Sequence, residues 1–323
     1  MQPEVFCLGA INVDLTYRVD DIAGFLQNWG TGLTRGGEEA LSRADEARLL
    51  DLLAKFARPS ARFGGGSAAN TAYALAKLGF SAALVGRVGA DADGAFLRDS
   101  LAGVNLDQVV QEGESGRAYI LVDPEGERTI LVIPNTNDDL QEKDLPWEAL
   151  SRARFLHLTA LVGDGPFELQ RQLVLGLHGG PRLTLDPGEL YARRGRAALE
   201  DWLDHVETLL VTEAEWGLLG GELKRHPDWA PPIVLVKRGP LGVQLITPVR
   251  YLDIPADFEG RPVDTLGAGD VFAAGYLAGL LTGLNLPQAV RLAEHAAAYK
   301  LGGAGRESYP DRKIMERIIA HLR

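Results

Sequence analysis

The sequence predicts an α/β fold in which a mainly parallel sheet lies between two layers of helices and carries a small β lid. Short apolar runs without strict alternation recur along the 323-residue chain, and longer segments with helical spacing separate them. This pattern is typical of strands that helices cover on both faces. Two other stretches alternate apolar and polar residues, as expected for strands with one face in water, and therefore predict the separate lid.

The main sheet is expected to take its strands from the apolar runs at residues 5–10, 81–89, 153–163, 182–188, 206–212 and 232–239. Helical spacing predicts helices at residues 67–78, 93–101, 166–177, 194–203 and 271–281. Because strands and helices alternate in this way, we expect a parallel sheet with helices on both of its faces.

The lid is expected from two segments that lie far apart in the chain, residues 11–22 and residues 107–135. Residues 11–20 alternate in polarity, and residues 116–134 form two alternating runs joined by the turn sequence Asp-Pro-Glu-Gly, which predicts a hairpin. Residues 24–60 are predicted to be an insertion that ends in a helix at 42–56. Residues 1–323 are treated as one domain.

Composition excludes several classes of partner. The chain has 33 lysine and arginine residues against 44 acidic ones, a net charge of −11, and no basic run that could follow a nucleic acid backbone. Cys7 is the single cysteine, so neither an internal disulfide nor a thiolate metal cluster is expected. The apolar stretch at 271–286 falls short of the roughly 20 residues that cross a membrane. We therefore expect a cytoplasmic protein with no nucleic acid or membrane partner.

The stretch DTLGAGD, residues 264–270, immediately precedes an apolar helical segment. Its small residues allow a ligand to approach the backbone, and the free N–H groups of the helix start would attract an anion. A carboxylate beside an anion hinders binding but suits a general base, which must lie within hydrogen-bond reach of the attacking hydroxyl. The alternative is that Asp270 is only a helix N-cap and the glycines only a tight turn.

A second glycine cluster, GGGSAAN, occupies residues 64–70. Gly64, Gly66 and Ala69 satisfy a relaxed dinucleotide-binding pattern, which leaves a nicotinamide-dependent oxidoreductase as an alternative. The context argues against it, because residues 57–63 are a poor buried strand and no acidic residue follows in the stretch AALVGRV to hold a ribose. A P-loop is excluded, since no lysine in the chain follows a glycine.

Together, these motifs resemble those of the ribokinase-like (PfkB) carbohydrate and nucleoside kinases. The resemblance covers almost the whole chain and rests on GGSAAN, the following GRVGADADG, and DTLGAGD with its apolar helix. The early INVD, the lid hairpin, KRGPLG at 237–242 and AEHAAAYKLGGAG near the C-terminus also match. The resemblance implies a ribokinase-like three-layer α/β/α body, with activity toward a sugar or a nucleoside.

The resemblance also implies roles for individual residues. Asp270 would be the general base, and the amides of Gly267, Ala268 and Gly269 would form the anion hole for the transferring phosphoryl group. The residues implied for binding the acceptor are Asn12, Asp14, Gly65, Gly66 and Asn70. Two alternatives stay open, because Asn70 is also a good helix cap and Asp14 could lie on the solvated face of an edge strand. Arg117, at the start of the lid hairpin, is a candidate partner for a sugar acid or sugar phosphate.

ATP and Mg²⁺ are the cofactors that the resemblance implies. The residues that match the nucleotide region are Lys237, Gly239, Gly242, Thr265, Ala297 and Gly305, although lysine at this place is also typical of a solvated strand end. Related kinases usually carry N-x-x-E where this chain has TEAE, so Thr212 stands in the asparagine place. Glu215 keeps the glutamate place and is expected to hold Mg²⁺ through water, since Mg²⁺ retains several waters in protein sites.

The predicted function is an ATP-dependent kinase that transfers the γ-phosphoryl group to a primary hydroxyl of a sugar or nucleoside. The insertion at 24–60 favours the adenosine-kinase-like branch. The alternatives are the oxidoreductase described above and a catalytically inactive metabolite-binding protein of the same fold. Because proteins of this family often pair through their β lids, a homodimer through the alternating lid strands is also predicted.

Overall fold

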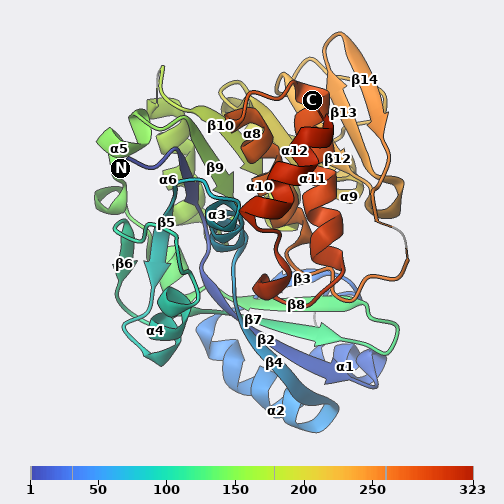
Figure 1. Ribbon diagram of the computed structural model, residues 1–323. Helices are drawn as coiled ribbons and strands as arrows, with labels where there is room; N and C mark the ends of the chain where they lie inside the picture. The colour runs from blue at the N-terminus through green and yellow to red at the C-terminus, as the bar shows by residue number, and fades with distance from the viewer. Residues whose placement is uncertain (1, 31, 178, 259, 323) are drawn as a thin grey trace.

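The computed structural model describes residues 2–30, 32–177, 179–258 and 260–322, and it has the predicted three layers (Figure 1). The nine-stranded main sheet has the order β14-β13-β12-β11-β10-β9-β1-β5-β6. Its strands are β1 Val5–Leu8, β5 Ala82–Val88, β6 Val109–Gln111, β9 Phe155–Thr159, β10 Arg182–Asp186, β11 Thr208–Thr212, β12 Ile233–Lys237, β13 Val243–Thr247 and β14 Arg250–Ile254. All six predicted apolar runs contain a strand, and these six pair in parallel.

Alternate residues of the central strand β1 enter two separate hydrophobic cores. Val5 and Cys7 belong to one core, and Phe6 and Leu8 to the other. The first core also takes side chains from α3 Ser67–Lys77, α4 Ala92–Asp99, α10 Ala268–Leu281, α11 Leu286–Leu301 and α12 Arg312–Leu322. The second takes them from α5 Trp147–Ser151, α6 Asp164–Gly176, α7 Gly188–Ala192, α8 Arg196–Leu203 and α9 Glu213–Leu218. Burial on both faces explains why the strands lack alternation.

A second sheet of five strands lies at one end of the body (Figure 1). In order across the sheet, its strands are β3 Glu38–Ala40, β8 Arg128–Ile133, β7 Gly116–Val122, β2 Asn12–Val19 and β4 Ala57–Gly65. The sequence indicated three of these strands, β2, β7 and β8, but placed β3 and β4 in the insertion. β4 was missed because it is a largely exposed edge strand without an apolar pattern, and β3 because it has only three residues. Residues 109–111, expected in the lid, instead form β6 at the edge of the main sheet.

The outer face of the small sheet is covered by two helices from the insertion, α1 Ile22–Trp29 and α2 Glu46–Phe56 (Figure 1). Phe25, Trp29, Leu49 and Leu53 of these helices are buried against strand residues such as Leu121. This apolar face of the small sheet is therefore covered within the chain, and the homodimer through the lid stays a prediction.

Short turns connect several of these elements. Short 3₁₀ turns lie at Arg43–Asp45, Asn135–Asp139, Glu142–Asp144, Gly239–Leu241 and Arg306–Ser308. Within the described ranges, none of the helices combines the length and the apolar character needed to cross a membrane.

The packing of α2 on the small sheet can be tested with two neighbouring leucines. Leu49→Ala is expected to lower the free energy of unfolding by about 2–5 kcal/mol, because it opens a cavity at a buried position. Leu50→Ala serves as the control, since Leu50 is 45% exposed and its loss is expected to cost less than about 0.5 kcal/mol. Denaturant unfolding measures both values, and equal losses would contradict this packing.

Candidate active site

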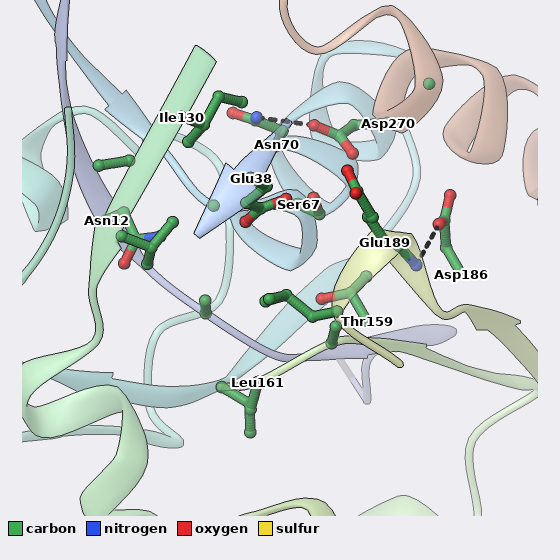
Figure 2. A pocket seen from close by; sticks show the side chains of 18 of the residues that line it. Asn12, Glu38, Ser67, Asn70, Ile130, Thr159, Leu161, Asp186, Glu189 and Asp270 are labelled. Atoms are coloured by element: carbon green, nitrogen blue, oxygen red, sulfur yellow. Dashed lines mark hydrogen bonds between the residues drawn. The ribbon is translucent and has the colours of Figure 1, made fainter. Parts of the chain in front are cut away.

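Two cavities meet at the N-terminus of α10. The lid-side cavity, of about 450 Å³, lies between the small sheet and the main body and is bounded by Asn70, Ile130 and Asp270 among others (Figure 2). The helix-side cavity, of about 500 Å³, is bounded by β12, α10 and α11. Thr212 and Gly269 line both cavities. Two ligands, one in each cavity, would therefore meet at the start of α10. This junction lies on the side of the sheet where the parallel strands end.

The loop at 264–270 is held by a buried ion pair. Lys300, which is fully buried, donates to the Asp264 carboxylate at 2.8 Å and to the Asp264 carbonyl at 3.1 Å. The same carboxylate accepts from the backbone N–H groups of Leu266 at 3.0 Å and Gly305 at 3.2 Å, and Arg128 of the small sheet pairs with it. Burial alone would raise the pKa of Asp264, but these hydrogen bonds and the Lys300 charge lower it. Asp264 is thus a fixed anion that shapes the loop.

The start of α10 presents free backbone donors. Gly267 is the N-cap residue and has φ of 76°, and the N–H of Ala268 donates to the Thr265 carbonyl at 3.2 Å. Among the described residues, the N–H groups of Gly267 and Gly269 have no hydrogen-bond partner. Unsatisfied N–H groups and the positive end of the helix dipole make this an anion-binding position. Of the three amides predicted for the anion hole, two are free to bind.

Asp270 lies in the first turn of α10, with its carboxylate toward α3. Asn70 Nδ2 donates to Asp270 Oδ2 at 2.7 Å (Figure 2). The Asn70 carbonyl oxygen in turn accepts from Arg306 Nε at 2.9 Å. Burial raises the pKa of Asp270 to about 6, although the hydrogen bond from Asn70 opposes this shift. Since the N-caps of α10 and α3 are Gly267 and Gly66, neither Asp270 nor Asn70 is a helix cap.

Of the residues implied for binding the acceptor, Asn12, Asp14, Gly66 and Asn70 line the lid-side cavity. Asp14 is 6% exposed, so it does not lie on a solvated strand face, and burial raises its pKa to about 7. Asn12 lines the cavity while accepting a hydrogen bond from Asn137 Nδ2 at 2.7 Å. Gly65 and Gly66 allow close packing: a Cβ at Gly65 would collide with the Asp14 carboxyl, and one at Gly66 with the Ala10 carbonyl.

Arg117 lies outside both cavities. Its guanidinium donates to Glu46 of α2 at 3.0 Å and to Asp93 of α4 at 3.1 Å, and these two carboxylates hold its pKa above the usual range despite burial. The side chain joins the small sheet to its covering helix and to the main body. It is therefore not available to an anionic acceptor in this structure.

Most of the residues implied for the nucleotide line the helix-side cavity, namely Lys237, Gly239, Gly242, Thr265 and Ala297. Gly305 does not line this cavity, and its N–H donates to the Asp264 carboxylate. Lys237 is not a solvated strand end, because its ammonium donates to Asp186 Oδ2 at 2.7 Å. The hydroxyl of Thr265 accepts from Arg128 of the small sheet.

Thr212 and Glu215 form a capping box at the start of α9. The Glu215 carboxylate accepts from the Thr212 N–H at 2.7 Å, and the Thr212 hydroxyl accepts from the Glu215 N–H at 3.2 Å. Burial raises the pKa of Glu215, whereas the nearby charge of Lys237 lowers it.

No group of three or more histidine, cysteine, aspartate or glutamate side chains suited to hold a metal occurs within the described ranges. Carboxylates of Asp186 and Glu215 beside the junction still fit Mg²⁺, which needs few protein ligands.

Several cavity residues were missed in the sequence because they come from segments without a motif of their own. Glu38 lies on the three-residue strand β3, and Asp186 ends β10. Arg306, which follows α11 and donates to Asn70 without lining either cavity, was missed for the same reason. Ser67, which also lines the lid-side cavity, was within reach of prediction, because it sits inside the GGGSAAN cluster and begins α3.

A parallel α/β sheet whose two cavities meet at a glycine-rich helix start defines a class of enzymes that hold a phosphate group beside a second ligand. Residues 57–311 match the pfkB family carbohydrate kinases. The chain is 32% identical over 259 residues to the ATP-dependent ribose-1-phosphate kinase of Halopiger xanaduensis, covering 78% of this chain and 85% of that protein. It belongs to the pfkB family and is a phosphotransferase with an alcohol group as acceptor.

Solved structures show the same fold. The adenosine kinase of Sinorhizobium meliloti has a TM-score of 0.84 with 22% identity, covering 99% of this chain and all (100%) of that one. Arabidopsis thaliana ribokinase complexed with ribose and ATP has a TM-score of 0.76 with 23% identity, covering 99% of each chain. The ribokinase-like fold predicted from the sequence is thereby confirmed.

The conformation of the loop can be tested with a pair of glycines. Gly267→Ala is expected to destabilise the protein by about 1–2 kcal/mol or more, because a left-handed backbone strains an alanine and its Cβ would meet the Tyr309 hydroxyl. Gly269→Ala is the control, since Gly269 is helical and its nearest neighbour would be Lys237 Nζ at 3.5 Å. Urea unfolding of both variants measures the difference; a Gly269→Ala variant as unstable as Gly267→Ala would contradict the described loop.

Proposed function

We propose that this protein is an ATP-dependent kinase that transfers the γ-phosphoryl group to a primary hydroxyl of a sugar or nucleoside. The observation that carries the proposal is the meeting of the two cavities at Gly269, beside the Asp270 carboxylate and the free amides of α10. ATP would occupy the helix-side cavity and the acceptor the lid-side cavity. Similar folds bound to ATP or ADP, such as the Arabidopsis ribokinase, support ATP as the donor.

In the proposed reaction the acceptor oxygen attacks the γ-phosphorus while Asp270 takes the hydroxyl proton. The bond from the γ-phosphorus to the oxygen bridging to the β-phosphorus breaks, so the products are the phosphorylated acceptor and ADP. The N–H groups of Gly267 and Gly269 would stabilise the charge on the transferring group, which is the main requirement of phosphoryl transfer. Lys237 would contribute a positive charge from the nucleotide side.

Mg²⁺ is proposed as the metal of this reaction, with Glu215 and Asp186 holding it through water. When bound, it would neutralise part of the charge on the phosphates. Glu215 is fixed for this purpose by the capping box with Thr212, because one carboxylate oxygen is held by the Thr212 N–H. In this proposal Thr212, which stands in the asparagine place, orients Glu215 and does not itself contact the waters around Mg²⁺.

The lid-side cavity suits an acceptor with one polar and one apolar part. Asp14, Asn70 and Asp270 in its lining offer partners for hydroxyl groups, and the lining also includes the aliphatic residues Ile120, Ile130, Val132, Leu161 and Leu190. These aliphatic residues would favour a nucleoside, whose base is apolar on both faces, over a bare sugar. The small sheet would act as the lid, excluding water from the acceptor.

The oxidoreductase alternative gains no support from the second glycine cluster. Gly64 lies near the end of the edge strand β4 and Gly66 is the N-cap residue of α3. A Cβ at Gly64 would meet the Ser100 hydroxyl and one at Gly66 the Ala10 carbonyl, so these glycines serve close packing within the chain. An inactive binding protein is likewise disfavoured, because the hydrogen bonds that orient Asp270 are complete.

Asp270→Asn tests the proposed base. We expect a loss of about 10²–10⁴-fold in kcat with ATP binding retained, because the amide cannot accept the hydroxyl proton. Asp51→Asn on the exposed face of α2 is the matched control and is expected to leave the rate unchanged. ADP release across a panel of sugars and nucleosides measures both, and an Asp270→Asn variant as active as the control would refute the assignment.

The acid limb of the pH profile tests the role of Asn70. Because the protonated carboxyl cannot act as base, kcat/KM is expected to fall as pH drops through the pKa of Asp270, about 6. Asn70→Ala removes a hydrogen bond that favours the charged form, so the limb should move to higher pH. A limb that stays in place or moves to lower pH in Asn70→Ala would contradict this role.

A further inference from the structure

The lid-side cavity is lined by six carboxylate residues and, among the described residues, by neither lysine nor arginine. The six are Asp14, Glu38, Asp186, Glu189, Glu215 and Asp270. Three of them are engaged elsewhere: Asp186 by Lys237, Glu189 by Arg193 at 2.7 Å, and Glu215 by the Thr212 N–H. Asp270 accepts from Asn70. The charges of Asp14 and Glu38 are the ones that the protein leaves for a ligand.

Asp14 on β2 and Glu38 on β3 both line this cavity, although β7 and β8 lie between their strands in the small sheet. The side chains of both lack a hydrogen-bond partner among the described residues, although Asp14 is 6% exposed. A buried polar group without a partner is costly unless a ligand or water satisfies it. Glu38 lies on β3 and extends toward the cavity beside Ser67 and Asn70 (Figure 2). Burial raises the pKa of both carboxyls to about 7. Neighbouring acids raise these pKa values as well, whereas the charge of Arg306 lowers that of Asp14 and the charge of Arg193 lowers that of Glu38.

The nearest cations lie behind the cavity wall and are already engaged. Arg306 donates to Asn70, Ser100 and the Gly65 carbonyl, and Arg193 donates to Glu189. Lys237 pairs with Asp186 and lines the other cavity. Arg117, the cation expected from the sequence, pairs with Glu46 and Asp93. The charges of Arg306 and Arg193 act on Asp14 and Glu38, but neither arginine lines the cavity. A phosphate or carboxylate on the acceptor would therefore be buried beside these acids without the charge-assisted partners that such groups require.

We propose that the acceptor carries no anionic group and that Glu38, together with Asp14, excludes sugar phosphates and sugar acids from the lid-side cavity. The inference rests on the proposed kinase function and narrows its substrate class. It separates this chain from the relative in Halopiger xanaduensis, which is named for an anionic acceptor, ribose 1-phosphate. Glu38 comes from the segment at residues 24–60, so this segment would supply acceptor selectivity as well as the helices that cover the lid.

Two matched acceptor pairs test the proposal: ribose with ribose 1-phosphate, and adenosine with its 3′-monophosphate, in which the 5′-hydroxyl stays free. The intact protein is expected to phosphorylate the neutral member of at least one pair and to show at least about a hundredfold lower kcat/KM for the anionic member, because like charges juxtaposed in a buried site are strongly unfavourable. An anionic member that reacts as well as its neutral partner would overturn the proposal.

Glu38→Gln removes one charge at nearly constant shape. We expect it to raise kcat/KM for the anionic member relative to the neutral one by about tenfold or more. Glu39→Gln is the matched control: Glu39 is the next residue on β3, does not line the cavity, and accepts from Trp29 Nε1 at 3.2 Å. A selectivity change no greater in Glu38→Gln than in Glu39→Gln would overturn the role of Glu38.

Calorimetric binding of the same four acceptors separates this inference from the proposed function. If no acceptor reacts with ATP, the kinase proposal fails, yet binding of a neutral member without its anionic partner would still support the charge exclusion. Equal binding of both members, or binding of neither in both pairs, would overturn it.

Discussion

The site depends on one buried ion pair, between Asp264 and Lys300. Lys300 lies at the end of α11 with no exposed surface, and its ammonium binds the carboxylate and carbonyl of Asp264 and the carbonyl of Gly303. Removing one partner of such a pair typically costs about 3–5 kcal/mol, because the other charge is left buried and unpaired. With Asp264 fixed, the loop must turn at Gly267, and α10 begins where the two cavities meet. The placement of Asp270 and of the free amides follows from this anchor.

Burial has two effects on the carboxylates beside this loop. It raises the pKa of Asp270 to about 6, which brings a carboxyl group closer to the range where a base accepts a proton readily at neutral pH. It also makes every additional negative charge in the lid-side cavity expensive, since neighbouring acids cannot be screened by water. In the proposed reaction, the environment that would make Asp270 an effective base would also limit the charge of the acceptor. Function and selectivity have one physical origin here.

The sequence predicted the parts of the structure that are encoded locally. The main sheet follows from apolar runs, and the loop at 264–270 from glycines placed next to an acid and an apolar helix. Contacts between segments that lie far apart in the chain could not be predicted from the sequence. The edge strand β4 has a polar sequence and pairs only because β2 lies beside it. Arg117 was expected at the acceptor, but the fold brings Glu46 and Asp93 to its guanidinium from two helices. Glu38 and Asp186 have no motif, and only the assembled cavity makes them neighbours of Asp270.

A crystal structure with an acceptor and a non-hydrolysable ATP analogue bound together tests the proposed site most directly. We expect the terminal phosphate of the analogue at the N–H groups of Gly267 and Gly269, and the acceptor hydroxyl within hydrogen-bond distance of the Asp270 carboxylate. A terminal phosphate bound elsewhere, or an acceptor whose hydroxyl faces away from Asp270, would contradict the central claim that the two cavities serve one reaction.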